Sequence, residues 1–163
     1  MSVIKTKALC IFSNDDKILV SEYKNPKTGE PFYRPLGGNI EFTESSKQGL
    51  KREIQEELET CVCNLELLDV IENIYYFKDK YSHEILFIYD GMFEDEKFYN
   101  LNQFEGYEKT DNRKFKVMWK PLGQFIRGDA ILYPEGLLDL LQQKVFLDQN
   151  YNFSEIQETE LSV

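Results

Sequence analysis

Alternating apolar and polar residues near the start of the chain predict β-strands, because a period of two buries one face of a strand. The runs at residues 7–12 and 17–23 flank a turn-forming Asn-Asp-Asp sequence, which predicts an opening hairpin. A shorter run at residues 32–36 predicts a third strand that leads into a loop at Gly37 and Gly38. The first part of the chain is therefore predicted to be mainly sheet.

A helical period follows this glycine pair. Leu50, Ile54 and Leu58 recur every fourth residue, which predicts an amphipathic helix ending near residue 58. Its start is predicted at residue 43 or 45, because potential capping side chains precede the apolar stripe: Thr43, Ser45 and Ser46.

The second half of the chain repeats the strand pattern. Apolar runs predict strands at residues 65–77, 84–93 and 114–119. Residues 94–113 are polar and acidic with scattered aromatics, which suggests a long functional loop, with a lid as one interpretation. Pro134 stands at a plausible first helical position before a leucine-rich segment and predicts a second helix. One domain is expected over residues 1–147, with a peripheral tail over residues 148–163.

Composition narrows the class of protein. A chain of 163 residues with 42% hydrophobic residues can bury a core of its own. The sequence has neither a signal-peptide pattern nor an apolar run long enough to span a bilayer, so a cytoplasmic protein without membrane partners is expected. Cys10, Cys61 and Cys63 lack the paired spacing of a zinc or redox motif, and reduced thiols are expected.

The net charge of -10 excludes long nucleic acids as the main partner, because it repels a phosphate backbone. A small phosphorylated substrate remains compatible with this charge if cations stand between its phosphates and the protein carboxylates.

Three carboxylates share one side of the predicted helix. At about 100° per residue, Glu53, Glu56 and Glu57 fall beside one another. Their mutual repulsion would be relieved by divalent cations, and oxygen ligands of this kind suit Mg²⁺ or Mn²⁺. The helix alone does not exclude the simpler interpretation, which is a solvated acidic face.

A longer pattern separates these interpretations. In GNIEFTESSKQGLKREIQEE, the fixed positions follow Gx5Ex7REUxEE, where U is a bulky aliphatic residue, and they are Gly38, Glu44, Arg52, Glu53, Glu56 and Glu57. This segment resembles the Nudix box, and the neighbouring YRPLGGNIEF, SHEILFIYD and LYPEGLLDLL segments resemble small bacterial Nudix proteins of unassigned substrate.

The resemblance implies a fold and a chemistry. The implied fold is of the α/β (α+β) class, an α/β/α sandwich with a mixed β-sheet. The implied activity is that of a magnesium-dependent (or manganese-dependent) hydrolase in which Glu53, Glu56 and Glu57 hold metal together with the carbonyl of Gly37. Arg52 and Glu44 are implied as supporting groups, and Arg52 can also pair with Glu56 one helical turn away.

The base that accepts a proton from the attacking water is not fixed by the pattern. Glu53 is the first choice, and Glu105 or Glu108 in the acidic 94–113 segment is the alternative, against an ordinary role as solvated acids.

Substrate contacts are expected at the glycine loop and on the strands. Arg34 is a candidate phosphate ligand, with a salt bridge of the fold as its other interpretation. Gly38 would allow close approach of the backbone to substrate. Glu84 and Tyr133 are candidate pocket residues, although an aromatic residue in so aromatic a chain is more often part of the core.

The sequence departs from the family pattern just after the acidic residues, where Glu59 and Thr60 replace the usual glycine and aliphatic residue. Either Glu59 accepts a left-handed conformation, or the helix ends differently. Gly49 is also unusual within a helix, and close approach by the glycine loop or simple tolerance would account for it.

These residues predict a pyrophosphohydrolase that cleaves a phosphoanhydride in a nucleoside diphosphate linked to another moiety. A nucleoside triphosphate, a nucleotide sugar and a dinucleoside polyphosphate all remain candidate substrates. The alternatives are a catalytically weak nucleotide-binding regulator on the same fold and an isomerase or other transferase variant. Whether the protein forms a homodimer is left open.

Overall fold

Two β-sheets and four helical segments form the fold of residues 1–144, which are the residues described by this computed structural model. The strands are β1 (Ile4–Ile11), β2 (Ser13–Asn14), β3 (Lys17–Lys24), β4 (Pro31–Arg34), β5 (Leu36–Asn39), β6 (Val62–Phe77), β7 (Lys80–Phe93), β8 (Gln103–Glu108) and β9 (Arg113–Pro121). The helices are α1 (Ser46–Leu58), the 3-10 helix η1 (Glu96–Asn100), α2 (Leu122–Ile126) and a further helical segment at residues 137–144.

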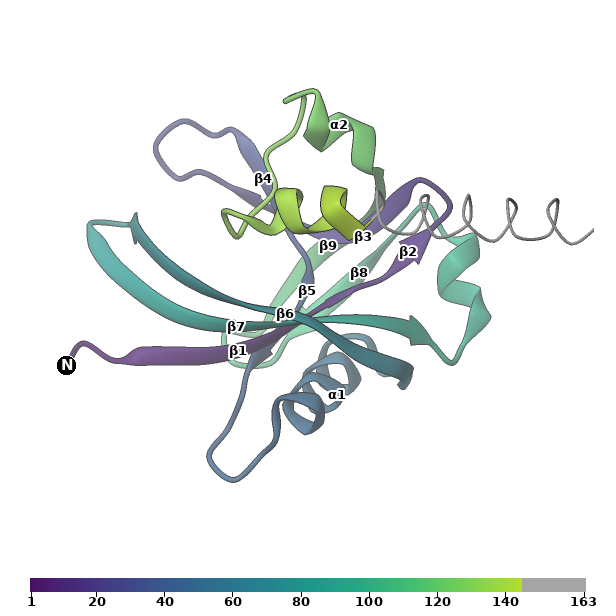
Figure 1. Ribbon diagram of the computed structural model, residues 1–163, viewed down its shortest axis with the longest axis horizontal. Coiled ribbons are helices and arrows are strands. Elements are labelled where there is room, and N and C mark those ends of the chain that lie inside the picture. Colours follow the sequence, from purple (N-terminus) through teal and green to yellow (C-terminus); the bar gives the residue numbers. More distant parts are fainter. Residues whose placement is uncertain (145–163) are drawn as a thin grey trace, which may run out of the picture.

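The first sheet has the order β5-β1-β7-β6 and is mixed, because β1 runs parallel to β7 and antiparallel to β5. The second sheet is antiparallel, with the order β2-β3-β9-β8 and with β4 paired to β3. In Figure 1, α1 lies on one side of the β1-β7-β6 ribbon, and α2 and the 137–144 segment lie on the other. The predicted α/β/α sandwich with a mixed sheet is confirmed.

The core is divided by β1, whose successive residues face opposite sides of the sheet. Ala8 and Cys10 pack in the cluster that contains Leu50 and Ile54 of α1, and Leu9 packs in the cluster on the other face. Both faces of β1 are thus covered, which explains why this strand reads as a continuous apolar run.

The predicted opening hairpin is wrong in part. The run at residues 7–12 belongs to β1 in the first sheet, and the run at residues 17–23 belongs to β3 in the second. A tight turn does follow Asn14, but it joins β3 only to the two-residue strand β2. Because β1 is apolar on both faces, it occupies an inner position beside β7 and cannot serve as a hairpin arm at a sheet edge.

Three further expectations are corrected. Gly37 and Gly38 lie within strand β5, paired with β1, and do not form a loop. The proposed long loop at residues 94–113 contains η1 and β8, because Phe98 and Phe104 pack on the core and order the segment. The second helix begins at residue 137, after a turn, and not at Pro134.

The chain also forms the short helix α2, which the sequence pattern did not predict. The predicted tail at residues 148–163 lies outside the described residues. None of the helices within residues 1–144 is long and apolar enough to cross a membrane.

Helix α1 has well-defined ends. Ser45 caps its first turn in a reciprocal capping box with Gln48, which satisfies two backbone donors. Glu59 ends it in the left-handed conformation at φ 53° and ψ 39°, so this residue adopts the geometry that glycine normally supplies. Gly49 faces Ile40, which follows the last residue of β5. Close approach of Gly37 and Gly38 is therefore not the reason for a glycine at this position.

Replacement of Glu59 by glycine should stabilise the protein. A residue other than glycine in the left-handed conformation costs about 1 to 2 kcal/mol. Glycine removes this cost, but its greater flexibility in the unfolded chain cancels part of the gain in stability. We expect Glu59→Gly to raise the free energy of unfolding by about 0.5 to 1 kcal/mol in urea denaturation. Glu59→Ala is the control, since it keeps the strain; an equal gain in both variants would contradict this explanation.

Candidate active site

Arg52 is the centre of a carboxylate cluster on α1. Its guanidinium donates to Glu44 at 3.0 and 2.9 Å, to Glu53 at 3.1 Å and to Glu56 at 3.3 Å. It also donates to the carbonyl oxygen of Asn39 at 2.8 Å, which ties the helix to the end of β5. Hydrogen bonding to Glu44, followed by the nearby charges, raises the pKa of Arg52, so this side chain is a permanent cation. One arginine therefore fixes the positions of three carboxylates.

Glu53 approaches the backbone of β5 so closely that a side chain at Gly38 would displace its carboxylate. A Cβ atom placed on Gly38 would lie 2.4 Å from the Glu53 carboxylate carbon. Burial, partly offset by Arg52, raises the pKa of Glu53 above its usual range. The missing side chain at Gly38 thus makes the space that this carboxylate occupies.

Glu57 is the acid of the cluster whose ionised form is least stabilised by its surroundings. Its Oε2 atom is buried without a hydrogen-bond partner among the described residues. Burial, together with the charges of Glu53, Glu108 and Glu56, raises the pKa of Glu57 to about 8. A buried carboxylate of this kind requires either a proton or a cation beside it.

Strand β8 supplies one further carboxylate. Alternate residues of β8 face the same side, and Glu108 is close enough for its charge to raise the pKa of both Glu53 and Glu57. Glu105 points to solvent instead, where it pairs with Lys114 at 3.5 Å. The two loop candidates are therefore separated, with Glu108 at the cluster and Glu105 away from it.

The donor set of the cluster fits a hard divalent cation. Carboxylate oxygens are the ligands preferred by Mg²⁺ and Mn²⁺, and the partnerless Glu57 oxygen provides one that is already desolvated. Within residues 1–144, however, no three acidic, histidine or cysteine side chains already converge as a ligand set. The reason is visible in the contacts of Arg52, which hold Glu53 and Glu56 turned toward the guanidinium.

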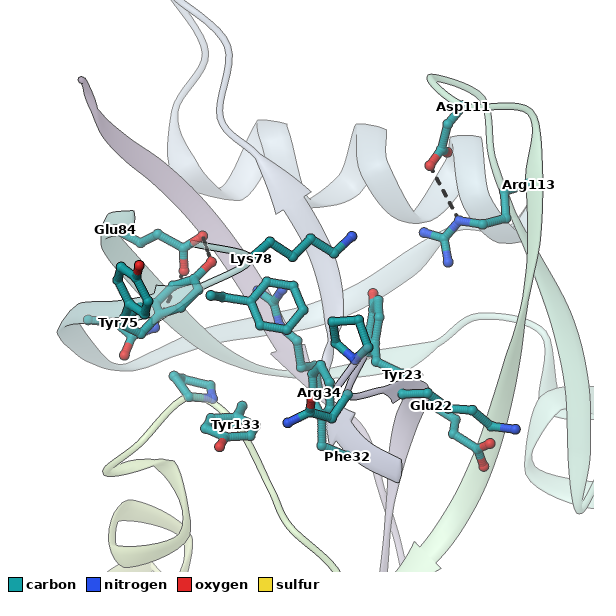
Figure 2. Close-up of a pocket in the computed structure, with 17 residues that line it drawn as sticks. Glu22, Tyr23, Phe32, Arg34, Tyr75, Lys78, Glu84, Asp111, Arg113 and Tyr133 are labelled. Carbon is teal, nitrogen blue, oxygen red and sulfur yellow. Dashed lines mark hydrogen bonds and ion pairs between the residues drawn. The ribbon is translucent and has the colours of Figure 1, made fainter. Parts of the chain in front are cut away.

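A separate set of residues lines a cavity of about 710 Å³ (Figure 2). We call it the aromatic cavity. Its walls include the side chains of Phe32, Arg34, Tyr75, Phe77, Glu84 and Tyr133. This volume is in the range of small-molecule sites.

Glu84 forms a buried ion pair at the wall of the aromatic cavity. Its Oε1 atom lies 2.8 Å from Lys7 Nζ, and it accepts hydrogen bonds from Tyr75 at 3.3 Å and Asn73 at 3.5 Å. Burial opposes ionisation of Glu84, but Lys7 and Arg34 outweigh it and lower the pKa of this carboxyl. Glu84 is therefore a fixed anion whose charge is matched by Lys7.

Two short backbone segments connect the aromatic cavity with the carboxylate cluster. Arg34 in the cavity wall precedes Gly37 by three residues along the chain. Arg113, also in the wall, is the direct strand partner of Glu108. A molecule bound across both regions would thus pass along the ends of β4 and β8.

A family model described as the NUDIX domain matches residues 4–133, which is more than three quarters of the chain. The chain belongs to the Nudix family. The structural relatives agree on the fold, and no curated protein sequence matches the chain.

Three solved structures illustrate this likeness, and at these identities each shows the fold alone. A MutT NUDIX hydrolase from Burkholderia pseudomallei has a TM-score of 0.53 at 19% identity, covering 82% of this chain and 90% of its own. A NUDIX hydrolase from Nitrosomonas europaea has a TM-score of 0.54 at 14% identity, covering 86% and 87%. A NUDIX-family hydrolase from Clostridium perfringens has a TM-score of 0.55 at 17% identity, covering 89% and 98%.

In this Nudix protein the residues singled out from the sequence fall into two groups. The first surrounds the start and middle of α1 and contains Gly37, Gly38, Glu44, Arg52, Glu53, Glu56, Glu57 and Glu108. The second lines the aromatic cavity and contains Arg34, Glu84 and Tyr133. Glu105 belongs to neither group.

Sequence reasoning missed two charged residues of these groups. The sequence pattern predicts only that Lys7 begins a strand. A lysine beside a buried apolar run is rarely buried without an acidic partner, which here is Glu84. Glu41 lies 3.8 Å from Arg52, and no spacing rule marked it.

The neighbouring glycines of β5 should respond differently to alanine. In Gly37→Ala the new Cβ would lie 2.0 Å from the carbonyl oxygen of Ala8, at a φ of 144°, so we expect more than about 1 kcal/mol of lost stability. In Gly38→Ala only the Glu53 carboxylate must move, so stability should change little while Mn²⁺ binds at least about tenfold more weakly.

Urea denaturation and Mn²⁺ titration by calorimetry would measure both effects. Equal losses of stability in the two variants, or Mn²⁺ affinity unchanged in Gly38→Ala, would contradict this account.

Proposed function

We propose that this protein is a metal-dependent pyrophosphohydrolase that cleaves a phosphoanhydride in a nucleoside diphosphate derivative. The observation that carries the proposal is the crowding of carboxylates around α1, above all the buried and partnerless oxygen of Glu57. A fold does not accumulate uncompensated buried charge without a use for it, and such sites are frequently functional. Family membership supports the same class of reaction.

The residues proposed to hold Mg²⁺ or Mn²⁺ are Glu53, Glu56, Glu57 and the carbonyl of Gly37, and Glu108 extends their negative charge. A divalent cation bound there would neutralise the diphosphate and increase the acidity of a coordinated water. Donation of Glu53 and Glu56 to metal requires them to turn from Arg52, which would keep its bonds to Glu44 and Asn39. Arg52 and Glu44 are thus positioning residues in this proposal.

A carboxylate must accept the proton of the attacking water. Glu53 is the proposed base, because burial raises its pKa and thereby increases its basicity. Glu108 is the alternative, and its position on a strand would hold it beside the cluster without any loop movement. Glu105 is no longer proposed for this role, since it faces solvent and pairs with Lys114.

Hydrolysis assays on a nucleotide panel test the activity. With Mg²⁺, the wild-type protein should release phosphate or a mononucleotide from a nucleoside triphosphate, a nucleotide sugar or a dinucleoside polyphosphate. Glu57→Gln should lower the rate at least about a hundredfold, because it removes a charged oxygen from the cluster. Glu59→Gln, on the same helix but exposed, is the matched control and should retain its activity.

If the wild-type protein and Glu57→Gln are equally inert on the whole panel, the pyrophosphohydrolase is refuted. The nucleotide-binding regulator on the same fold then becomes the better account.

The two acids of β8 provide a second matched pair. Glu108→Gln should lower kcat by about tenfold or more, since both a base and a metal ligand require the ionised carboxylate. Glu105→Gln, three residues away on the opposite face of the strand, should remain within about twofold of the wild type. Steady-state kinetics on the best substrate of the panel would measure kcat for both variants. Equal kcat values would show that Glu108 has no role in the active site.

A further inference from the structure

The charges of the aromatic cavity differ from those of the chain as a whole. The sequence has 29 acidic and 19 basic residues, yet the cavity lining contains four basic side chains and three acidic ones. Two of the three acids already have positive partners, because Glu84 pairs with Lys7 and Asp111 pairs with Arg113 at 3.3 Å. The cavity is therefore a locally cationic region in an acidic protein.

Arg34 is the half-buried cation of this cavity and has no carboxylate partner in the described part of the chain; Lys24 and Lys78 have none there either, but both are exposed. Among residues 1–144 no acidic oxygen lies within 4.0 Å of its guanidinium, which instead lies over the ring of Tyr23, 5.8 Å from the centroid. Its backbone is fixed by the β3–β4 pairing, and its carbonyl oxygen accepts a hydrogen bond from Ser21. The side chain is thus held at the wall of the cavity with its donors unused by any acid.

The neighbours of Arg34 leave one positive charge uncompensated. Arg34 is close enough to the Lys7–Glu84 pair to act on both: after burial, its charge is the next cause that lowers the pKa of Lys7. The three charges sum to plus one, because Glu84 can neutralise only one of the two cations. An anion bound at Arg34 would complete the set, and guanidinium groups match phosphate geometry particularly well.

Beside this charge lies a surface suited to a flat ring. Phe32 is the central member: Tyr23 stacks on it at 5.5 Å, and the rings of Tyr133 and Phe77 lie edge-on to it at 5.3 and 6.2 Å. Phe32 and Arg34 are two residues apart on β4, so their side chains face the same side of the strand, and both line the cavity. Aromatic side chains bind planar heterocycles by stacking and edge contacts.

We propose that Arg34 is a specificity residue that reads a phosphate in the aromatic cavity, so that the cavity takes a nucleoside monophosphate unit in preference to an uncharged nucleoside or sugar. The base would lie against Phe32, Phe77 and Tyr133. This inference rests on the proposed function, in which that unit is the nucleotide half of the substrate. The moiety beyond the cleaved anhydride would then lie outside the cavity.

Binding to the metal-free protein tests the inference without any turnover. In EDTA, which removes metal-mediated phosphate binding at α1, calorimetric titrations would use AMP, GMP, adenosine, guanosine and ribose 5-phosphate. At least one monophosphate should bind about tenfold or more tightly than its own nucleoside and than ribose 5-phosphate. Arg34→Met should bind the monophosphate no more tightly than the nucleoside, while its affinity for the nucleoside stays within about twofold of the wild type. Arg34→Lys should keep part of the preference for the monophosphate.

Arg127→Met is the matched control, because Arg127 is an exposed arginine outside the cavity that pairs with Asp129. It should leave every affinity unchanged. The inference is overturned if the wild type binds none of the five probes or binds monophosphate and nucleoside equally. It also fails if Arg34→Met weakens both ligands to the same extent, which indicates a structural role, or if ribose 5-phosphate binds as tightly as the monophosphates.

The two proposals fail separately. Metal-dependent hydrolysis without phosphate discrimination in EDTA would remove Arg34 from its role and leave the pyrophosphohydrolase intact. Phosphate discrimination through Arg34 in a protein that hydrolyses no member of the panel would preserve the cavity assignment and refute the enzyme.

Discussion

Electrostatic repulsion among the carboxylates of α1 and β8 is the constraint on which the rest of the site depends. One cation, Arg52, bonds Glu53 and Glu56 of α1 as well as Glu44 just before it, and Glu57 and Glu108 have no cationic partner within residues 1–144. The fold tolerates this because the adjacent stripe of α1 is anchored in the core by Leu50 and Ile54, both fully buried. Apolar packing of this stripe thus sustains an unfavourable charge arrangement beside it.

The site has two parts that differ in rigidity and in charge. The carboxylate cluster is strongly negative and is fixed to β5 through Arg52, the Asn39 carbonyl and the space left by Gly38. The aromatic cavity contains an internally balanced Lys7–Glu84 pair and the additional cation Arg34. Because β4 and β5 are separated by a single residue, a phosphate chain could extend from one part to the other along a continuous backbone.

Much of this arrangement could be predicted from the sequence, for local reasons. The helical period of Leu50 and Ile54, the Ser45 cap and the fixed spacing of the acids all lie within one short segment, so no tertiary information was required. The predictions that were wrong or left open concern contacts between residues far apart in the sequence. The partner of β1 is β7, more than seventy residues away, and the choice between Glu105 and Glu108 depends on which face of β8 meets α1. Strand β8 alternates one glycine with aromatic and acidic residues and has no periodic apolar signal, so its sequence predicts a loop.

The acidity of the chain bears on how the proposed substrate could reach its site. A net charge of -10 and a carboxylate cluster repel a free diphosphate, so the cluster cannot collect its substrate by electrostatic attraction alone. A diphosphate already complexed with a divalent cation carries less negative charge and brings to Glu57 the counterion that its buried oxygen lacks. The cationic aromatic cavity offers the remaining phosphate a favourable position on the other side. The same repulsion that destabilises the empty cluster would therefore select for a metal-complexed substrate, since only that form compensates both charges together.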